Sequence, residues 1–355
     1  MDAARGRAAA RPVADPSALD RAGAVLSGAR RPLVLLGGGA QDAGEQALAL
    51  ARRIAAPIGL TINGRGAVPD RDPLCLGSAL SFAPVSDLLR EADAVVLAGA
   101  QLSDLELWGL SEPLTLHGLI RVDIDAEQLS NRWPAEVALQ ADAGAALAAL
   151  AQRAPGRAPS DVQDAEATVR RARETLQAPA ELTRFADLLA VIDRVLGEDR
   201  IITGDSTQPV YAANHLLGMD RPRSWLMPIG YGCLGCAMPM AIGAKLAAPD
   251  RPVLALAGDG GVMFSIQELA AAREAGAAVV TLVYDNGGYG EIRDSMDHAG
   301  IAQLGTEAPT HDLAAIAEGF GVPALRSRTA AELEEALHRA FAAGGPVLVH
   351  HRDRR

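Results

Sequence analysis

The chain has 355 residues, 49% of them hydrophobic, and a formal net charge of −11 at pH 7, so it is long enough for two domains with complete cores. The acidic balance argues against a nucleic-acid partner and an anionic membrane surface, and no stretch reaches the roughly 18 uninterrupted apolar residues of a membrane span. Residues 1–14 lack the apolar core of a secretion signal, and three cysteines in so long a chain are typical of a reducing compartment, so we expect a cytoplasmic protein.

Short apolar runs alternate with helical patterns along the whole chain, which is typical of doubly wound parallel sheets. A helix is expected at residues 43–55, and strands are expected at 33–36, 58–62, 94–98, 119–124 and 347–350. The Pro- and Gly-containing residues 155–179 indicate a linker, within which residues 161–176 form a charged helix with a solvated face. We therefore expect an α/β fold of two Rossmann-like domains, at residues 12–154 and 180–355.

The most informative segments are two glycine-containing turns in the second domain. The first, residues 258–261, follows an apolar run at 253–257 that predicts a buried strand. A helix is expected at 263–275, and a second buried strand at 279–284 leads to the second turn, residues 285–288. Because the carboxyl ends of parallel strands meet at one edge of the sheet, both turns are expected at the same ligand-binding edge.

The side chains of these turns suit a hard cation that holds a diphosphate. Asp259 offers a carboxylate and Asn286 a carboxamide, the oxygen ligands that Mg²⁺ takes in proteins. With 24 residues at positions 261–284, the pair resembles the thiamine-diphosphate motif, Gly-Asp-Gly followed by Asn-Asn. The resemblance implies that Asp259, Asn286 and the carbonyl of Gly288 bind Mg²⁺, and that the cofactor is lined by Gly258, Gly260 and Gly261. The first Asn of the motif is replaced by Asp285, whose extra negative charge requires a hydrogen-bonding partner.

Two further segments resemble the same family. Residues 230–244 are similar to its Gly-x-hydrophobic-Gly segment, which implies that Leu234 holds the cofactor in a bent shape and that the Gly232 carbonyl accepts a hydrogen bond from the aminopyrimidine. Both residues would thus be catalytic through the conformation of the cofactor. Residues 201–208 resemble the segment that opens the diphosphate-binding domain, in which the residues expected to contact phosphate at a helix start are Ser206, Thr207 and Gln208.

The resemblance covers two of the usual three domains of this family. Residues 94–100 and 122–125 resemble its middle domain, whereas no residue can be assigned to the pyrimidine-binding domain or to its activating Glu. We expect a separate chain or a longer parent protein to supply that domain, and the isolated chain to have little activity. Because family active sites form between subunits, we also expect a homo-oligomer or a complex with a pyrimidine-domain chain.

The family resemblance implies an enzyme of the acetolactate synthase and 2-oxo acid decarboxylase type, a lyase or transferase. It would decarboxylate a small 2-oxo acid with thiamine diphosphate and Mg²⁺, after which the enamine is protonated or undergoes carboligation. Residues 287–292 look more like decarboxylases of long or basic 2-oxo acids. The alternative is a non-catalytic assembly or regulatory subunit that retains the cofactor-binding fold.

Other cofactors and motifs receive less support. Residues 37–39 form a Gly-Gly-Gly run without the spacing of a dinucleotide loop, which disfavours NAD. FAD is possible but not favoured, because residues 101–103 stand where flavin-binding relatives often have Arg-Phe. Cys233 and Cys236 have redox spacing, yet they lie inside the cofactor segment, so small-residue packing is the favoured interpretation.

The remaining titratable residues give no specific signal. The seven histidines show no metal-ligand spacing. His298 and His311 follow the second turn, where the family has a loop that closes over substrate, so they are candidate substrate contacts. A structural role is expected for the others: surface exposure for His350 and His351, and support of the fold for His117, His215, Glu268 and Glu291.

Overall fold

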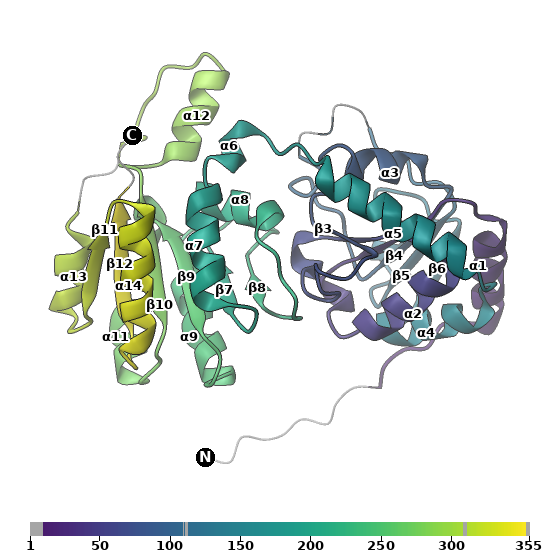
Figure 1. Ribbon diagram of the computed structural model, residues 1–355, viewed down its shortest axis with the longest axis horizontal. Helices are drawn as coiled ribbons and strands as arrows, with labels where there is room; N and C mark the ends of the chain where they lie inside the picture. Colours follow the sequence, from purple (N-terminus) through teal and green to yellow (C-terminus); the bar gives the residue numbers. More distant parts are fainter. Residues whose placement is uncertain (1–9, 109, 111–112, 308–310, 353–355) are drawn as a thin grey trace. The chain divides into compact units, whose positions relative to one another are not determined.

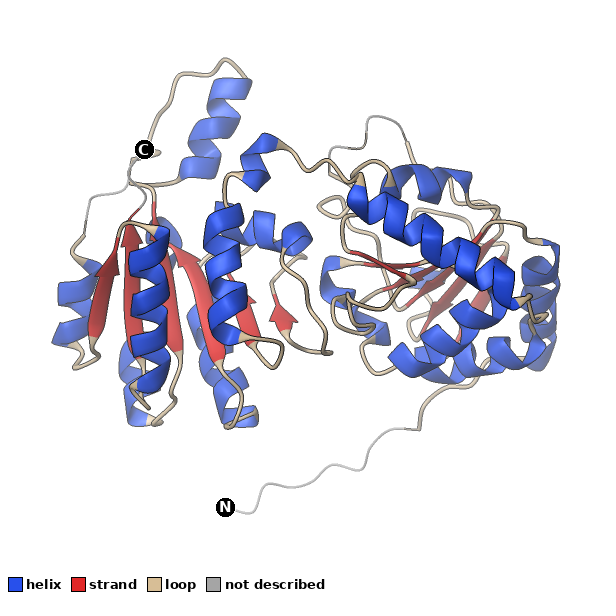
Figure 2. Ribbon diagram, in the orientation of Figure 1, coloured by secondary structure: helices blue, strands red, loops and turns tan. Residues whose placement is uncertain are grey.

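The computed structural model describes residues 10–108, 110, 113–307 and 311–352, which leaves most of the N-terminal stretch discussed above outside the described residues. The chain divides into two compact units, residues 1–176 and 177–355. Each unit is built on a six-stranded sheet (Figure 1), and helices cover both faces of each sheet (Figure 2). The expected α/β fold of two parallel-sheet domains is confirmed. Within the described residues, no helix has both the length and the apolar character needed to cross a membrane.

The first unit has the strand order β3-β2-β1-β4-β5-β6, with every described pair parallel. Its strands are β1 (Pro32–Leu36), β2 (Ile58–Leu60), β3 (Cys75–Gly77), β4 (Ala94–Ala98), β5 (Leu119–Asp123) and β6 (Val137–Gln140). Its helices are α1 (Pro16–Gly28), α2 (Gly44–Ile54), α3 (Val85–Glu91), α4 (Ala143–Arg153) and α5 (Pro159–Glu174), with short 3₁₀ turns η1 (Gly38–Ala40), η2 (Ile62–Gly64) and η3 (Gln128–Ser130). The expected helix at 43–55 and the four strands expected in this unit are present, with ends shifted by at most two residues.

Strand β1 shows why these strands are continuous apolar runs. Leu33 and Leu35 pack into one core cluster, whereas Val34 and Leu36 pack into another on the opposite face. A strand covered by helices on both faces has no solvent-facing position for a polar side chain. Helix α5, which falls within the expected linker, buries a stripe of small and apolar residues, Ala165, Val169 and Ala172.

The second unit has the strand order β11-β12-β10-β9-β7-β8. Its strands are β7 (Ile201–Gly204), β8 (Trp225–Leu226), β9 (Val253–Gly258), β10 (Val280–Asp285), β11 (Ala324–Ser327) and β12 (Val347–Arg352). Its helices are α6 (Ala180–Thr183), α7 (Ala186–Leu196), α8 (Gln208–Leu216), α9 (Ala237–Ala247), α10 (Asp259–Val262), α11 (Glu268–Glu274), α12 (Gly290–His298), α13 (Leu313–Gly319) and α14 (Ala330–Ala342). Strands β7, β9 and β10 are neighbours, so the segments that follow them meet at one edge of the sheet.

Two expectations for this unit were wrong. The helix expected at 263–275 is shorter than predicted, because the one-turn helix α10 ends at 262 and the chain turns at 263–267 before α11 begins and buries Leu269 and Ala272. His350 and His351 are not surface residues: their exposed fractions are 9% and 8%. Both lie on β12, an inner strand between β10 and β11.

Candidate functional site

The carboxyl edge of the second sheet contains a cavity of about 180 Å³. Every residue that the sequence analysis assigned to the cofactor borders it, namely Ser206, Thr207, Gln208, Gly232, Leu234, Gly258, Asp259, Gly260, Gly261, Asn286 and Gly288. The cavity is also bordered by five residues without an assigned cofactor role, Tyr211, Tyr289, Gly290, Glu291 and Ile292. The strand order therefore brings four separate segments of the chain together around one space, while the individual roles of the residues stay predictions.

Asp259 supplies the carboxylate of this cavity. It follows β9 directly and is the first residue of α10. Burial, and secondly the negative charge of Asp285, raise the pKa of Asp259 to about 6, although the N–H groups of Gly260 and Gly288 donate hydrogen bonds to it. A cation close to Asp259 would favour the charged form of the carboxyl group and so lower this raised pKa.

Asn286 supplies a carboxamide at the same cavity. Its Nδ2 donates to Oε1 of Gln208 at 3.2 Å, and Nε2 of Gln208 in turn donates to Oδ2 of Asp294 at 2.7 Å. The Oδ1 atom of Asn286 is buried and has no hydrogen-bond partner among the described residues. Buried polar atoms are nearly always paired, so this orphaned oxygen fits a ligand such as a cation.

Glycines keep the space between these groups open. A Cβ added at Gly290 would lie 2.3 Å from Nδ2 of Asn286, and one at Gly260 would lie 2.7 Å from the Tyr289 ring. At Gly258 a Cβ would come within 2.8 Å of Oγ1 of Thr207. Real Cβ atoms do not approach so closely. A side chain at any of these positions would therefore displace a residue that borders the cavity.

The loop that carries Leu234 turns through two glycines with positive φ, Gly232 at 58° and Gly235 at 81°. Such angles are costly for other residues. The buried carboxylate of Asp205 anchors the loop, because its Oδ1 accepts the N–H of Ala237 at 2.8 Å at the start of α9. Burial and the charge of Asp205 raise the pKa of the Cys236 thiol to about 12. A thiol that stays protonated agrees with the packing interpretation for Cys236, whereas Cys233 is exposed.

The Gly-Gly-Gly run of the first unit, residues 37–39, packs closely against residues 98 and 99. The N–H groups of Gly37 and Gly39 donate to the carbonyls of Ala98 and Gly99 at 2.9 and 3.0 Å. These N–H groups are therefore engaged within the protein and not directed at a phosphate.

A buried carboxylate that sequence patterns did not predict, Glu106, joins two loops at the carboxyl edge of the first sheet. Its exposed fraction is 6%, and it accepts the N–H of Ile62 at 3.1 Å and that of Ser103 at 2.7 Å. A single Glu in a loop carries no pattern by which sequence alone would identify it.

The other titratable candidates lie outside the cavity or at its border. His298 and His311 are exposed, and neither borders the cavity. Glu291 does border it, and its Oε2 accepts a long hydrogen bond of 3.4 Å from Gln208. In the part of the chain that the structure describes, no three His, Cys, Asp or Glu side chains are grouped to hold a metal ion. Mg²⁺ at this site would depend on Asp259 together with amide and carbonyl oxygens.

Two models of one protein family match the chain, one in each unit. Residues 19–150 match the family model of the thiamine pyrophosphate enzyme central domain, and residues 205–351 match that of the C-terminal TPP binding domain. The chain belongs to the thiamine pyrophosphate enzyme family, of which it carries these two domains.

Curated relatives match nearly the whole chain. It is 39% identical to a probable 2-ketoarginine decarboxylase of Pseudomonas aeruginosa, over 98% of this chain and 62% of the relative. It is 31% identical to a benzoylformate decarboxylase of the same species (94% and 63%) and 28% identical to the large subunit of acetolactate synthase isozyme 1 of Escherichia coli (96% and 62%). The chain thus spans about three fifths of the length of these relatives.

Proposed function

We propose that the second unit binds thiamine diphosphate through Mg²⁺ and that the chain forms part of an enzyme that decarboxylates a 2-oxo acid. The observation that carries this proposal is the cavity bordered by both Asp259 and Asn286, together with the buried Oδ1 of Asn286 that has no hydrogen-bond partner among the described residues. When bound, thiamine diphosphate supplies an electron sink for the bond to the departing CO₂.

Different residues of the cavity would bind the metal ion, the diphosphate and the rest of the cofactor. Asp259, Asn286 and the carbonyl of Gly288 would hold Mg²⁺, which neutralises the charge of a diphosphate. Gln208 begins α8, where N–H groups without helical partners suit a phosphate oxygen, and its own amide is engaged with Asn286. Leu234 borders the cavity and would set the conformation of the cofactor.

We propose a basic 2-oxo acid as the substrate class. The support is the 39% identity with a protein named as a probable 2-ketoarginine decarboxylase, together with the acidic Glu291 at the border of the cavity. The same test distinguishes release of the protonated product from its carboligation to a second carbonyl compound. A pyrimidine-binding domain, from another chain or from further sequence of the same protein, would complete the active site.

The test is a decarboxylation assay of the chain together with such a domain, with 2-ketoarginine, pyruvate and benzoylformate as substrates. We expect the highest kcat/KM for 2-ketoarginine and the loss of at least about 99% of it in Asp259→Ala, a loss that corresponds to about 2.7 kcal/mol. Turnover that Asp259→Ala leaves unchanged would contradict the proposed site. Substantial turnover by the 355 residues alone would contradict the need for the additional domain.

We further propose that the protein is oligomeric and cytoplasmic. We propose a homo-oligomer or a complex with the chain that carries the pyrimidine-binding domain, which light scattering of the purified protein would detect as a mass above 36.8 kDa. The three cysteines, all present as free thiols, support a reducing compartment.

A further inference from the structure

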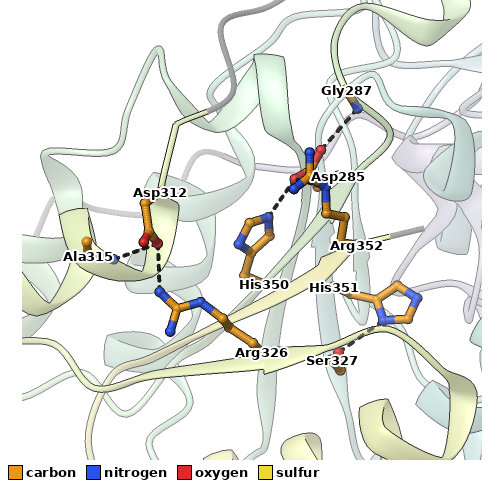
Figure 3. Close-up of polar contacts among 9 residues, drawn as sticks. All are labelled: Asp285, Gly287, Asp312, Ala315, Arg326, Ser327, His350, His351 and Arg352. Carbon is orange, nitrogen blue, oxygen red and sulfur yellow. Dashed lines mark hydrogen bonds and ion pairs between the residues drawn. The ribbon is translucent and has the colours of Figure 1, made fainter. Parts of the chain in front are cut away.

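The residue that departs from the family motif, Asp285, is almost completely buried. It ends β10, directly before Asn286, and its exposed fraction is 6%. A buried carboxylate is costly unless other groups pair with it. Three groups do so: Nε2 of His350 lies 2.7 Å from Oδ2, the N–H of Gly287 donates to Oδ1 at 3.0 Å, and Nε of Arg352 lies 3.6 Å from Oδ2 (Figure 3).

The partners of Asp285 come from the neighbouring strand. In the parallel pair β10–β12, Asp285 is in register with Arg352 and Val283 with His350, so both partners are placed by the sheet itself. A carboxylate only accepts hydrogen bonds, so Nε2 of His350 carries the hydrogen. The hydrogen bond to His350 is also the largest cause that lowers the pKa of Asp285. Neither His350 nor Arg352 borders the cavity.

These contacts fix the turn from which Asn286 projects. One carboxylate oxygen of Asp285 is held by β12 while the other closes the turn at Gly287. Arg293 on α12 holds the opposite side of the turn, since its guanidinium donates to the carbonyls of Asn286 and Gly287 at 3.1 and 3.2 Å. The side chain of Asp285 is thus the link between the inner strand β12 and the turn.

We propose that His350, with Arg352 as a weaker second partner, is a positioning residue for the metal-binding turn. It holds Asp285, and with it the turn, so that Asn286 stays at the cavity that Asp259 borders. The inference rests on the proposed Mg²⁺ site. It assigns a role to a histidine outside that site.

The test measures Mn²⁺ binding to the chain in the presence of inorganic pyrophosphate, by the electron paramagnetic resonance signal of free Mn²⁺. His350→Phe keeps a ring but removes the donor, and we expect it to weaken Mn²⁺ binding about ten-fold, the lower end of the usual effect of groups that orient metal ligands. His350→Gln keeps an N–H donor at a similar distance and should stay within about three-fold of the unmodified chain. Asp285→Asn removes the charge, so in that background His350→Phe should cost less than about three-fold.

His351 provides the matched control on the same strand. It points away from Asp285, and its Nδ1 lies 3.0 Å from Oγ of Ser327 (Figure 3). His351→Phe should therefore change Mn²⁺ affinity by less than about two-fold. Circular dichroism checks that each variant is folded, and His350→Ala replaces His350→Phe if the larger ring prevents folding.

The outcomes separate the two claims. If the unmodified chain binds no Mn²⁺, or if Asp259→Ala binds it equally well, the proposed metal site fails and the inference fails with it. If Asp259→Ala loses binding while His350→Phe retains it, the site stands and the role of His350 is refuted. The role is also refuted if His350→Phe and His351→Phe weaken binding equally, or if the loss is the same with and without Asp285→Asn.

Discussion

Metal binding at the proposed site should depend on pH through Asp259. Its pKa is about 6 in the metal-free chain, against an ordinary value of 3.8. A proton and the cation compete for the same carboxylate, so the apparent affinity falls by a factor of 1 + 10^(pKa − pH). This factor is about 11 at pH 5 but only about 1.1 at pH 7, so nearly the whole effect lies between these two values.

The assay is a Mn²⁺ titration at pH 5, 6 and 7 with a constant concentration of inorganic pyrophosphate. Asp259→Asn is the control, because an amide does not titrate and the protonation of pyrophosphate affects both proteins equally. Asp285→Asn should move the midpoint to lower pH, since the charge of Asp285 is the second cause of the raised pKa of Asp259. Burial is the larger cause, so the midpoint should stay above 3.8. Equal pH profiles for the unmodified chain and Asp259→Asn would refute this reasoning.

Three further predictions concern packing and stability. Gly290→Ala should weaken Mn²⁺ binding at least about ten-fold, because the added Cβ would lie 2.3 Å from Nδ2 of Asn286. Gly243→Ala is the control and should keep full affinity, because a Cβ at Gly243 would have no heavy atom within 4 Å. Glu106→Gln should lower the free energy of unfolding by about 1–3 kcal/mol in urea titrations, because one of the two backbone N–H groups that Glu106 accepts, from Ile62 and Ser103, loses its acceptor. An unchanged free energy of unfolding would contradict this role of Glu106. The pKa of Asp259 is higher in the folded chain than in the unfolded chain, so the folded chain binds more protons between about pH 4 and 6. The free energy of unfolding of the metal-free chain, measured in urea titrations, should therefore fall as pH rises through this window. An equal change of this free energy with pH in Asp259→Asn would exclude Asp259 as the cause.

Much of the fold and of the candidate site follows from local sequence patterns. Continuous apolar runs such as residues 253–257 predict buried parallel strands, and glycine turns at their ends predict which side chains meet at the sheet edge. Asp259 and Asn286 are separated by more than two dozen residues, yet the strand–helix–strand pattern was sufficient to predict that they border the same space.

What the sequence did not predict depends on long-range contacts. The burial of His350 follows from the position of β12 between β10 and β11, which no local pattern near the end of the chain encodes. The charge of Asp285 predicted a hydrogen-bonding partner but not which residue it is, and the partner is His350, 65 residues further along the chain. Gln208 was predicted as a phosphate contact, whereas its amide also orients Asn286 through a contact that only the assembled edge creates.

The central claim is that Asp259 and Asn286 anchor thiamine diphosphate through Mg²⁺, and calorimetry tests it most directly. Thiamine diphosphate is titrated in the presence of Mg²⁺ into the unmodified chain and into Asp259→Ala. We predict binding of one cofactor per chain and a loss of at least about thirty-fold in the variant, which corresponds to about 2 kcal/mol. Equal binding by both proteins, or no binding by either, would contradict the claim.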